Sequence, residues 1–390
     1  MKYVVREIEK QVLLALQSFP ALVLTGPRRS GKTCLLQHLF PRMQYVLLED
    51  PDVVMRLRED PQGFLDALKP PVILDEIQNV PELFSYIRSR IDRQPHRPGQ
   101  WMLTGSQEAP LMRGVTESMA GRAAVLQLLP FAYRESSKVT LLHGGFPEVV
   151  AHPLAASLWY SSYLQTYLER DVRSIMAIRD LATYRRFIAL LASRHGQVLN
   201  KTDLAAPLGV SVPTITQWLG ILETTAQILL VPPYYENLGK RLIKSPKLYL
   251  ADSGLACHLL GIGTALELAK SPFVGALFEG FVAAEIVKTQ MNRGMRRELY
   301  YFRDQQGLEV DFLVPRTGGG VALVECKAGR TVTPAMTVAM RRLAEAIGTT
   351  GRKSGVEMFL VHRPAKTASP TQAVAPGVRA LSWPDFFAVL

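Results

Sequence analysis

A glycine-rich segment near the N-terminus has the composition of a phosphate-binding loop. Residues 26–33 read GPRRSGKT and match the pattern GxxxxGK[ST], with an apolar run before them and a helical run after them. Glycine lets backbone N–H groups close around phosphate oxygens, and the N-terminus of the following helix adds a positive dipole end. In such loops the lysine contacts the outer phosphates and the hydroxyl residue ligates Mg²⁺. We therefore expect ATP at Gly26, Pro27, Arg28, Arg29, Ser30, Gly31, Lys32, Thr33 and Cys34, with Thr33 also on Mg²⁺.

An acidic pair, Asp75-Glu76, ends the apolar run at 72–74. After a phosphate loop, such a pair is expected at the edge of the same sheet, close to the nucleotide. Asp75 can hold the Mg²⁺ shell, and Glu76 can take a proton from the attacking water as general base. The pair therefore predicts hydrolysis of the nucleotide as well as binding.

Two further positions could act on the terminal phosphate. Thr104 and Ser106 lie at the tip of the run WMLTGS, where either hydroxyl could sense the γ-phosphate or orient the water. The alternative there is simple turn chemistry. Arg122 precedes the apolar run at 125–129, from which it could reach a neighbouring subunit's nucleotide as an arginine finger, or it could be an ordinary surface residue. We expect Ser106 and Arg122 to take part in catalysis.

A second group of charged residues suggests metal chemistry in the C-terminal third. Asp311 lies inside an expected strand, and Glu325 and Lys327 lie two residues apart on the next, so they share one face. Two carboxylates suit Mg²⁺ or Mn²⁺; the metal would activate water and the lysine would position it. The alternative is a solvated cross-face pair. We expect Asp311 and Glu325 to ligate a metal, and both to act with Lys327 in cleavage of a phosphodiester.

Three groups of elements must position these residues. Apolar runs alternate with helical patterns over 18–135, which predicts a parallel sheet with helices on both faces. Residues 155–195 read as helices. Residues 199–224 read as a helix, a turn at Gly209 and a second helix capped by Ser211. The remaining expectations are strands at 21–25, 45–48, 71–74, 101–104 and 125–129, a helix at 275–290, strands at 298–303, 309–314 and 321–326, a turn at Gly318–Gly320, a helix at 334–347, a strand at 356–361 and a loop at 363–378.

The helix–turn–helix pattern and the β-rich stretch after it look like a winged helix-turn-helix that could dock on DNA. Its second helix offers only uncharged groups (Thr214, Thr216 and Gln217), so phosphate contacts would come from four cations of the wing, Lys240, Arg241, Lys244 and Lys247. A protein-contact module is the alternative. The tyrosines at 160, 163 and 167 recur at helical spacing, which is more typical of a core than of a base-stacking platform.

Composition agrees with a cytoplasmic protein that has a polyanionic partner. The 390 residues carry 45 lysines and arginines against 34 acids, a net charge of 45 − 34 = +11. Such a surplus favours nucleic acid or nucleotide as partner, although solubility alone can account for it. The three cysteines are far apart and form no CxxC pair, which is typical of a reducing compartment. No run approaches 18 apolar residues, so we expect no membrane partner.

At this point the chain resembles a known family. GPRRSGKT, ILDEIQNVPEL, MLTGS and AGR, in this order, are similar to the AAA+ ATPases, and more narrowly to the bacterial and archaeal ATPases of the AAA-14 plus DUF4143 architecture. The C-terminal half agrees through YLERDVR, YLADSGLACHLLG, GALFEGFVAAE and the EVDF…VECKAG pair. The resemblance covers nearly the whole chain.

The resemblance implies an α/β fold: an AAA+ P-loop parallel sheet (1–150), a helical lid (151–198), a winged helix-turn-helix (199–262) and a C-terminal α/β domain similar to the PD-(D/E)xK nucleases (263–390). It also implies that Glu279, on the preceding helix, joins the metal ligands. The chain departs from the family name at Val310, where a proline would stand. Two functions remain open. One is an ATPase, expected as a homo-oligomer, that acts on DNA and possesses a nuclease domain. The other is a nucleotide-controlled switch whose C-terminal domain only binds a partner.

Overall fold

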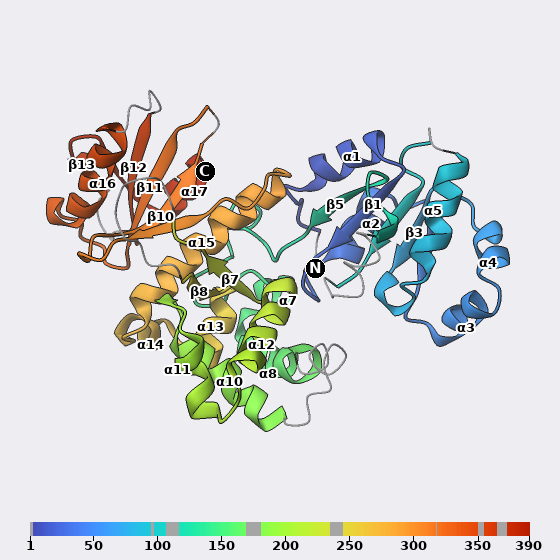
Figure 1. Cartoon of the computed structure of the whole chain (residues 1–390), viewed down its shortest axis with the longest axis horizontal. Helices are drawn as coiled ribbons and strands as arrows, with labels where there is room; N and C mark the ends of the chain where they lie inside the picture. The colour runs from blue at the N-terminus through green and yellow to red at the C-terminus, as the bar shows by residue number, and fades with distance from the viewer. Residues whose placement is uncertain are drawn as a thin grey trace.

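The computed structural model describes residues 3–94, 97–106, 117–168, 181–234, 245–316, 318–349, 355–364 and 373–390. Three units follow one another along the chain: an N-terminal unit drawn in blue to teal, a middle unit in green to yellow and a C-terminal unit in orange to red (Figure 1). Within the described residues, no single helix is long and apolar enough to cross a membrane, and the one helix pair that passes by length and composition together is bent by 110°.

The N-terminal unit is a five-stranded parallel sheet in the order β2-β3-β4-β1-β5, as alternating strand and helix signals predict. All five residues of β1 are buried, because helices cover both faces of the sheet and two apolar clusters fill them. The elements are α1 (Glu9–Ser18), β1 (Ala21–Thr25), α2 (Lys32–Leu39), β2 (Gln44–Leu47), α3 (Pro51–Glu59), α4 (Pro61–Ala67), β3 (Val72–Asp75), η1 (Ile77–Asn79), α5 (Leu83–Arg93), β4 (Trp101–Thr104) and β5 (Ala123–Gln127).

The middle unit is helical around one apolar core that runs from Phe146 to Leu277. Its helix–turn–helix forms as expected: Gly209 adopts φ 66°, the Ser211 hydroxyl accepts the Thr214 N–H, and the two helices meet at 110°. The elements are α7 (Pro147–Ala151), η2 (Pro153–Ala155), α8 (Ala156–Tyr163), the π-helical turn η3 (Leu164–Leu168), α10 (Leu181–Ser193), β6 (Gln197–Val198), α11 (Lys201–Ala205), η4 (Ala206–Leu208), α12 (Val212–Thr224), β7 (Ile228–Val231), β8 (Lys247–Leu250), α13 (Ser253–Leu259) and α14 (Ala265–Lys270).

Strands β6, β8 and β7 form a small antiparallel sheet with β8 in the middle. Tyr160 and Tyr163 are buried in the core, as their spacing predicts. The side chain of Tyr167 and most of the YLERDVR motif lie outside the described residues, as do the expected wing cations Lys240, Arg241 and Lys244.

The C-terminal unit is a six-stranded mixed sheet in the order β13-β14-β12-β11-β10-β9. The expected hairpin between β10 and β11 is present, with Pro315 opposite Val321. Helices α15 and α17 cover one face and α16 the other. The elements are α15 (Val274–Asn292), β9 (Tyr300–Arg303), β10 (Glu309–Pro315), β11 (Val321–Lys327), η5 (Pro334–Thr337), α16 (Val338–Thr349), β12 (Val356–His362), β13 (Ala373–Ala375), β14 (Val378–Ser382) and α17 (Trp383–Val389). The expectation of a loop throughout 363–378 is wrong, because β13 lies within it and pairs with β14.

Helix α15 joins all three units. Its apolar residues pack in one core with β7, β8 and the C-terminal sheet, and also with Leu129 and Phe131, which follow β5. Its C-terminal end reaches the N-terminal unit, where Gly294 lies against the Gln11 side chain of α1 (Figure 1). The phosphate loop and the charged residues of the C-terminal sheet are therefore parts of one packed body.

Candidate functional site

The phosphate loop connects β1 to α2 and has the backbone shape that its glycines permit. Gly26 adopts φ 143°, and a Cβ there would lie 2.1 Å from the Leu128 carbonyl oxygen. Gly31 adopts φ 96° and precedes the first turn of α2. Any larger residue at Gly26 would clash with backbone, so this close approach requires glycine. A loop of this shape can turn backbone N–H groups toward an anion.

Lys32 and Ser30 are two polar side chains of this loop that could contact a phosphate group. Its ammonium Nζ donates to the carbonyl oxygens of Gly26 (3.1 Å) and Pro27 (3.0 Å), and the side chain is buried. Both acceptors are neutral, so the positive charge is not cancelled by them. The Ser30 hydroxyl is also buried and has no hydrogen-bond partner. An ammonium and an unused hydroxyl around a glycine cradle fit a phosphate group, as the sequence predicts.

Asp75 at the end of β3 gathers three hydroxyl donors. Its Oδ2 accepts from Thr33 Oγ1 (2.7 Å) and from the Tyr45 hydroxyl (2.6 Å), and its Oδ1 accepts from Thr104. A carboxylate bonded to the loop's own threonine is where a Mg²⁺ ion would need it. Burial, with the hydrogen bond to Asp75, raises the pKa of Tyr45 far above its usual range, so Tyr45 remains a donor. Sequence patterns gave no signal for Tyr45.

Glu76 and Thr104 complete the edge of the sheet. Glu76 adopts the left-handed φ of 60°, its N–H donates to Thr104 Oγ1 at 3.4 Å, and its carboxylate accepts from the Gln78 amide. Of the two candidates at the tip of β4, Thr104 therefore binds the acidic pair. The buried Ser106 hydroxyl has no hydrogen-bond partner among the described residues, so it could contact a ligand. Residues predicted from three separate motifs, namely the phosphate loop, the Asp75-Glu76 pair and the WMLTGS segment, lie together here.

Arg6 is a further residue of this site, and sequence patterns did not single it out. Its guanidinium donates to the carbonyl oxygens of Ser30 (3.0 Å) and Leu129 (2.7 Å) and pairs with Glu135 (3.0 Å). Both side chains of the ion pair are almost fully buried. Arg6 thus ties the phosphate loop to the segment after β5. Its partners lie far away in the sequence, so only the fold reveals it.

In the C-terminal unit, four carboxylates gather at one end of the sheet; we call them the acidic centre (Glu279, Glu309, Asp311 and Glu325). Glu279 comes from α15, Glu309 and Asp311 from β10, and Glu325 from β11. Asp311 Oδ2 accepts the Cys326 N–H at 2.8 Å, which holds β10 and β11 together at this point.

Burial dominates the chemistry of the acidic centre. Burial and the charge of Asp311 raise the pKa of Glu325 to about 8 and that of Glu279 to about 7. Lys327 donates to Glu325 Oε1 at 2.7 Å, whereas Glu325 Oε2 is buried without a partner. The expected convergence of Asp311, Glu325 and Lys327 with Glu279 is therefore present, and it is not a solvated surface pair.

A lysine of the middle unit enters the same centre. Lys247 of β8 is 3% exposed, and its Nζ lies 2.8 Å from Glu279 Oε1, 2.6 Å from Glu309 Oε1 and 3.9 Å from Asp311 Oδ1. The expectation that Lys247 is a wing cation free to contact phosphate is wrong, because its charge is buried and paired with carboxylates.

The acidic centre does not fit a metal ion as it stands. Within the described ranges, no group of three or more histidine, cysteine, aspartate or glutamate side chains has the geometry to hold one. The carboxylates turn toward Lys247 and Lys327 instead. We therefore derive no catalytic step through a metal here.

Three family models match successive parts of the chain. Family models match residues 18–137 as an AAA domain (AAA_14), 134–266 as a domain of unknown function (DUF8612) and 274–376 as a second such domain (DUF4143). Two curated relatives, the uncharacterized proteins Rv2008c of Mycobacterium tuberculosis and Mb2031c of Mycobacterium bovis, are each 33% identical over 345 residues, which is 86% of this chain and 76% of theirs. The chain belongs to the AAA-domain P-loop ATPases that carry a DUF4143 domain.

Solved structures similar to this family member include P-loop ATPases. The Walker-type ATPase PabY2304 of Pyrococcus abyssi is 16% identical with a TM-score of 0.40, and the match covers 65% of this chain and 95% of that one. The Holliday junction branch migration motor RuvB of Thermotoga maritima is 17% identical with a TM-score of 0.30, covering 59% of this chain and 90% of that one.

The remaining predicted residues lie around the ATPase site or opposite it. Arg29 of the loop pairs with Glu148 of α7 at 3.7 Å, and Cys34 is exposed on α2. Arg122 precedes β5, so it lies at the amino edge of the parallel sheet, opposite the phosphate loop. There it pairs with Asp92 at 2.6 Å. Arg122 therefore cannot reach the nucleotide of its own chain.

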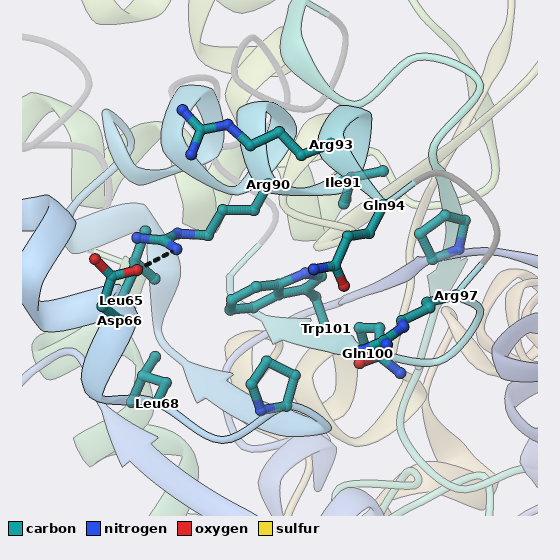
Figure 2. Close-up of a pocket in the computed structure, with 12 residues that line it drawn as sticks. Leu65, Asp66, Leu68, Arg90, Ile91, Arg93, Gln94, Arg97, Gln100 and Trp101 are labelled. Carbon is teal, nitrogen blue, oxygen red and sulfur yellow. Dashed lines mark hydrogen bonds and ion pairs between the residues drawn. The ribbon is translucent and has the colours of Figure 1, made fainter.

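A pocket of about 340 Å³ also lies at this amino edge and is not part of the ATPase site (Figure 2). Trp101 lies at its centre, and Arg90 on α5 bridges to Asp66 at 2.6 Å. Arg93 and Arg97 line it as well. This edge of the ATPase unit is therefore rich in arginine.

Proposed function

We propose that this chain is a Mg²⁺-dependent ATPase that acts on DNA. The observation that carries the proposal is the meeting of Lys32, Thr33, Asp75 and Glu76 at the carboxyl edge of the sheet. Lys32 and the loop N–H groups bind the phosphates, and Thr33 and Asp75 hold Mg²⁺. When bound, the metal neutralises charge that develops on the phosphates. Glu76 takes the proton of the attacking water.

The pattern of hydrogen bonds supports these roles. The Thr104 hydroxyl donates a hydrogen bond to Asp75 and accepts one from the Glu76 backbone N–H, so it holds Asp75 and Glu76 in position relative to one another. Ser106 and Ser30 have unused hydroxyls that can orient the water or a phosphate oxygen. Lys32 donates to two neutral carbonyl oxygens, and a hydrogen bond from an ammonium to a charged phosphate is stronger than one to a carbonyl.

Arg122 supports a further proposal, that the active form is an oligomer with Arg122 acting on a neighbour's nucleotide. Its position at the edge away from its own phosphate loop supports action between subunits, and an ordinary surface residue paired with Asp92 is the alternative. We expect Arg122→Ala protein and Lys32→Ala protein to be inactive alone and to regain some hydrolysis when mixed, because mixed oligomers contain intact shared sites. No recovery at any ratio, with mixed oligomers shown to form, would argue against the finger.

Action on DNA is supported by the helix–turn–helix and by the charge of +11. We propose that α11, α12 and the β6-β8-β7 sheet form a winged helix that contacts DNA. Thr216 and Gln217 on α12 are exposed but uncharged, so phosphate contacts fall to Lys240, Arg241 and Lys244.

The experiment that tests the proposal is ATP turnover with and without Mg²⁺ and with single-stranded, duplex and forked DNA. We expect turnover only with Mg²⁺, and an increase with at least one DNA. Glu76→Gln should bind ATP and hydrolyse it slowly, whereas Glu59→Gln, an exposed acid at the end of α3, should behave as wild type. Turnover that no DNA changes would favour the alternative, a nucleotide-controlled switch.

Cleavage of DNA by the C-terminal unit is a second candidate function, and one observation favours it. Glu279, Asp311, Glu325 and Lys327 converge at one end of a mixed sheet, as the residue pattern of PD-(D/E)xK nucleases would require. A nuclease assay on the same preparation, with Mg²⁺ or Mn²⁺, tests this. Asp311→Ala should remove any cutting and leave ATP hydrolysis intact, because the two sites lie in different units.

A further inference from the structure

Lys247 lies in the acidic centre but belongs to another unit than its carboxylates, since it comes from the small sheet of the middle unit. Its strand, β8, lies between β6 and β7. Tyr249, two residues further on the same face, donates its hydroxyl to Glu279 Oε1, the oxygen that Lys247 also contacts. Strand β8 therefore places two donors on Glu279, and one of them carries a full positive charge.

The contacts of Lys247 resemble those of a bound cation. Its Nζ bridges a carboxylate of α15 and a carboxylate of β10, with Asp311 slightly further away. The side chain is almost fully buried, and its ion-pair partners among the described residues are three carboxylates. We propose that the Lys247 ammonium takes the place of a divalent cation in the acidic centre and keeps the centre free of metal for as long as β8 holds it there.

The charges of the centre support this exclusion. The carboxyl groups of Glu279, Asp311 and Glu325, whose side chains are 15%, 13% and 10% exposed, face the ammonium groups of Lys247 and Lys327. Glu309 at the rim has a second partner, Arg303, at 3.5 Å. The Lys247 ammonium repels a second cation at this position. Replacing it by a neutral side chain removes one positive charge beside Glu279, Glu309 and Asp311, which favours a divalent ion there.

Glu325 offers one ligand atom for such an ion. Glu325 is 8% exposed, and its Oε2 is buried without a hydrogen-bond partner. A buried carboxylate oxygen left without a donor is costly unless something occupies it. The centre therefore holds Lys247 on its Glu279 side and an unused ligand on its Glu325 side.

The consequence is that the middle unit controls the acidic centre. Any movement of β8 away from α15 withdraws Lys247 and Tyr249 from Glu279 together. This control matters for cutting only if the second candidate function holds, whereas the exclusion of metal by Lys247 does not depend on it.

Mn²⁺ binding to the nucleotide-free full chain tests the inference, by electron paramagnetic resonance or calorimetry. Wild type should bind Mn²⁺ weakly at this centre, and Lys247→Met should bind it at least tenfold tighter. Adding Asp311→Asn to Lys247→Met should abolish the gain, which locates the ion. If Lys247→Met does not fold, Lys247→Met with Glu309→Gln removes one uncompensated charge and leaves Glu279, Asp311 and Glu325 in place.

The matched control is Lys288→Met on α15, the helix that contributes Glu279. Lys288 is also buried and pairs with a buried glutamate, Glu285, at 2.8 Å, but only one carboxylate is left behind when it is replaced. Lys288→Met should not gain Mn²⁺ affinity. The inference is overturned if folded Lys247→Met binds no tighter than wild type, or if Lys288→Met gains as much. It is also overturned if wild type already binds Mn²⁺ tightly and Asp311→Asn removes that binding. DNA cleavage is not read in this experiment, so an absence of nuclease activity would count against the second candidate function alone.

Discussion

Two buried lysines show how differently the two ends of this chain use the same residue. Lys32 contacts two carbonyl oxygens of its own loop, and Lys247 contacts carboxylates of another unit at similar distances. Carbonyl oxygens leave the charge of Lys32 available for an incoming anion. Carboxylates cancel the charge of Lys247. Lys32 therefore contacts neutral oxygens near the proposed phosphate position, whereas Lys247 is paired with carboxylates of the folded chain.

The largest expected difference between the ATPase site and the acidic centre is in the rate of ATP hydrolysis. Glu76→Gln keeps the shape of the side chain but removes the base, so ATP hydrolysis should fall by about 10²- to 10⁴-fold while ATP still binds. Glu325→Gln, the same change in the acidic centre, should leave hydrolysis at the wild-type rate. Steady-state phosphate release measures both. Equal rates for wild type and Glu76→Gln would remove Glu76 from its proposed role.

The second contrast is in stability. Lys247→Ala leaves the largely buried Glu279 and the half-buried Glu309 without their ammonium, and breaking a buried pair costs about 3–5 kcal/mol. Lys32→Ala removes hydrogen bonds to two neutral carbonyl oxygens and should cost less stability than the loss of a buried ion pair. Thermal unfolding of both variants without nucleotide, with wild type alongside, provides the comparison. Similar melting temperatures for the two variants would mean that Lys247 is not the buried ion-pair partner described here.

The third contrast is in ATP affinity, where replacing Lys32 should have a larger effect than replacing Lys247. Lys32→Ala removes a charge-assisted contact to phosphate worth about 2–3 kcal/mol, which corresponds to roughly 30- to 140-fold weaker ATP binding. Lys247→Ala, where it folds, should bind ATP as wild type does. Titration with a fluorescent ATP analogue measures the two affinities. A loss of ATP affinity in Lys247→Ala as large as that in Lys32→Ala would show that the sites are not independent.

How much of this the sequence could predict depends on how local each interaction is. The phosphate loop was predictable because its strand, glycines and helix are contiguous, and Asp75 because it ends a strand of the same sheet. Asp311, Glu325 and Lys327 followed from a hairpin with alternating faces. Lys247 was misread because its partners lie on α15 and β10, and Arg6 was missed because it pairs with Glu135, 129 residues away. Strand β13 was read as loop because it has three residues before Pro376-Gly377 and is defined by pairing with β14.

Acid should weaken the contact between the middle and C-terminal units before it affects the ATPase site. His195 is buried beneath α15, its Nδ1 accepts the Leu250 N–H at 3.0 Å, and burial lowers its pKa to about 4. The unfolded chain therefore binds the proton first. The stability that neutral His195 provides is complete above about pH 6.5 and falls by about 1.4 kcal/mol per pH unit down to about pH 4.

The measurement for His195 is a difference between proteins, because Glu279 and Glu325, whose pKa values are raised, shift stability with the opposite sign between about pH 4.5 and 8. The advantage of wild type over His195→Gln in thermal unfolding should be largest near pH 7 and shrink as the pH falls to 5. Exposed His152→Gln should follow wild type throughout. A wild-type advantage that stays constant with pH would mean that His195 is not held neutral by the fold.

The smallest effect concerns the salt dependence of DNA binding. It compares Lys247, whose charge is paired with carboxylates, with the proposed wing cations, whose charges would contact phosphate. Each phosphate contact that a cation makes contributes about 0.9 to the slope of log affinity against log salt. Replacing Lys240 and Arg241 by glutamine should therefore flatten the slope by about 2, if the proposed wing contacts DNA. Lys247→Met removes the same kind of charge from the same segment, yet it should leave the slope unchanged, because its ammonium already faces Glu279 and Glu309 and releases no counterion from DNA. Titrations of one duplex between about 50 and 200 mM salt cover the range in which the slope is measured. A slope that flattens equally in both proteins would mean that Lys247 leaves the acidic centre when DNA binds, and an unchanged slope in both would move the DNA contact away from the wing.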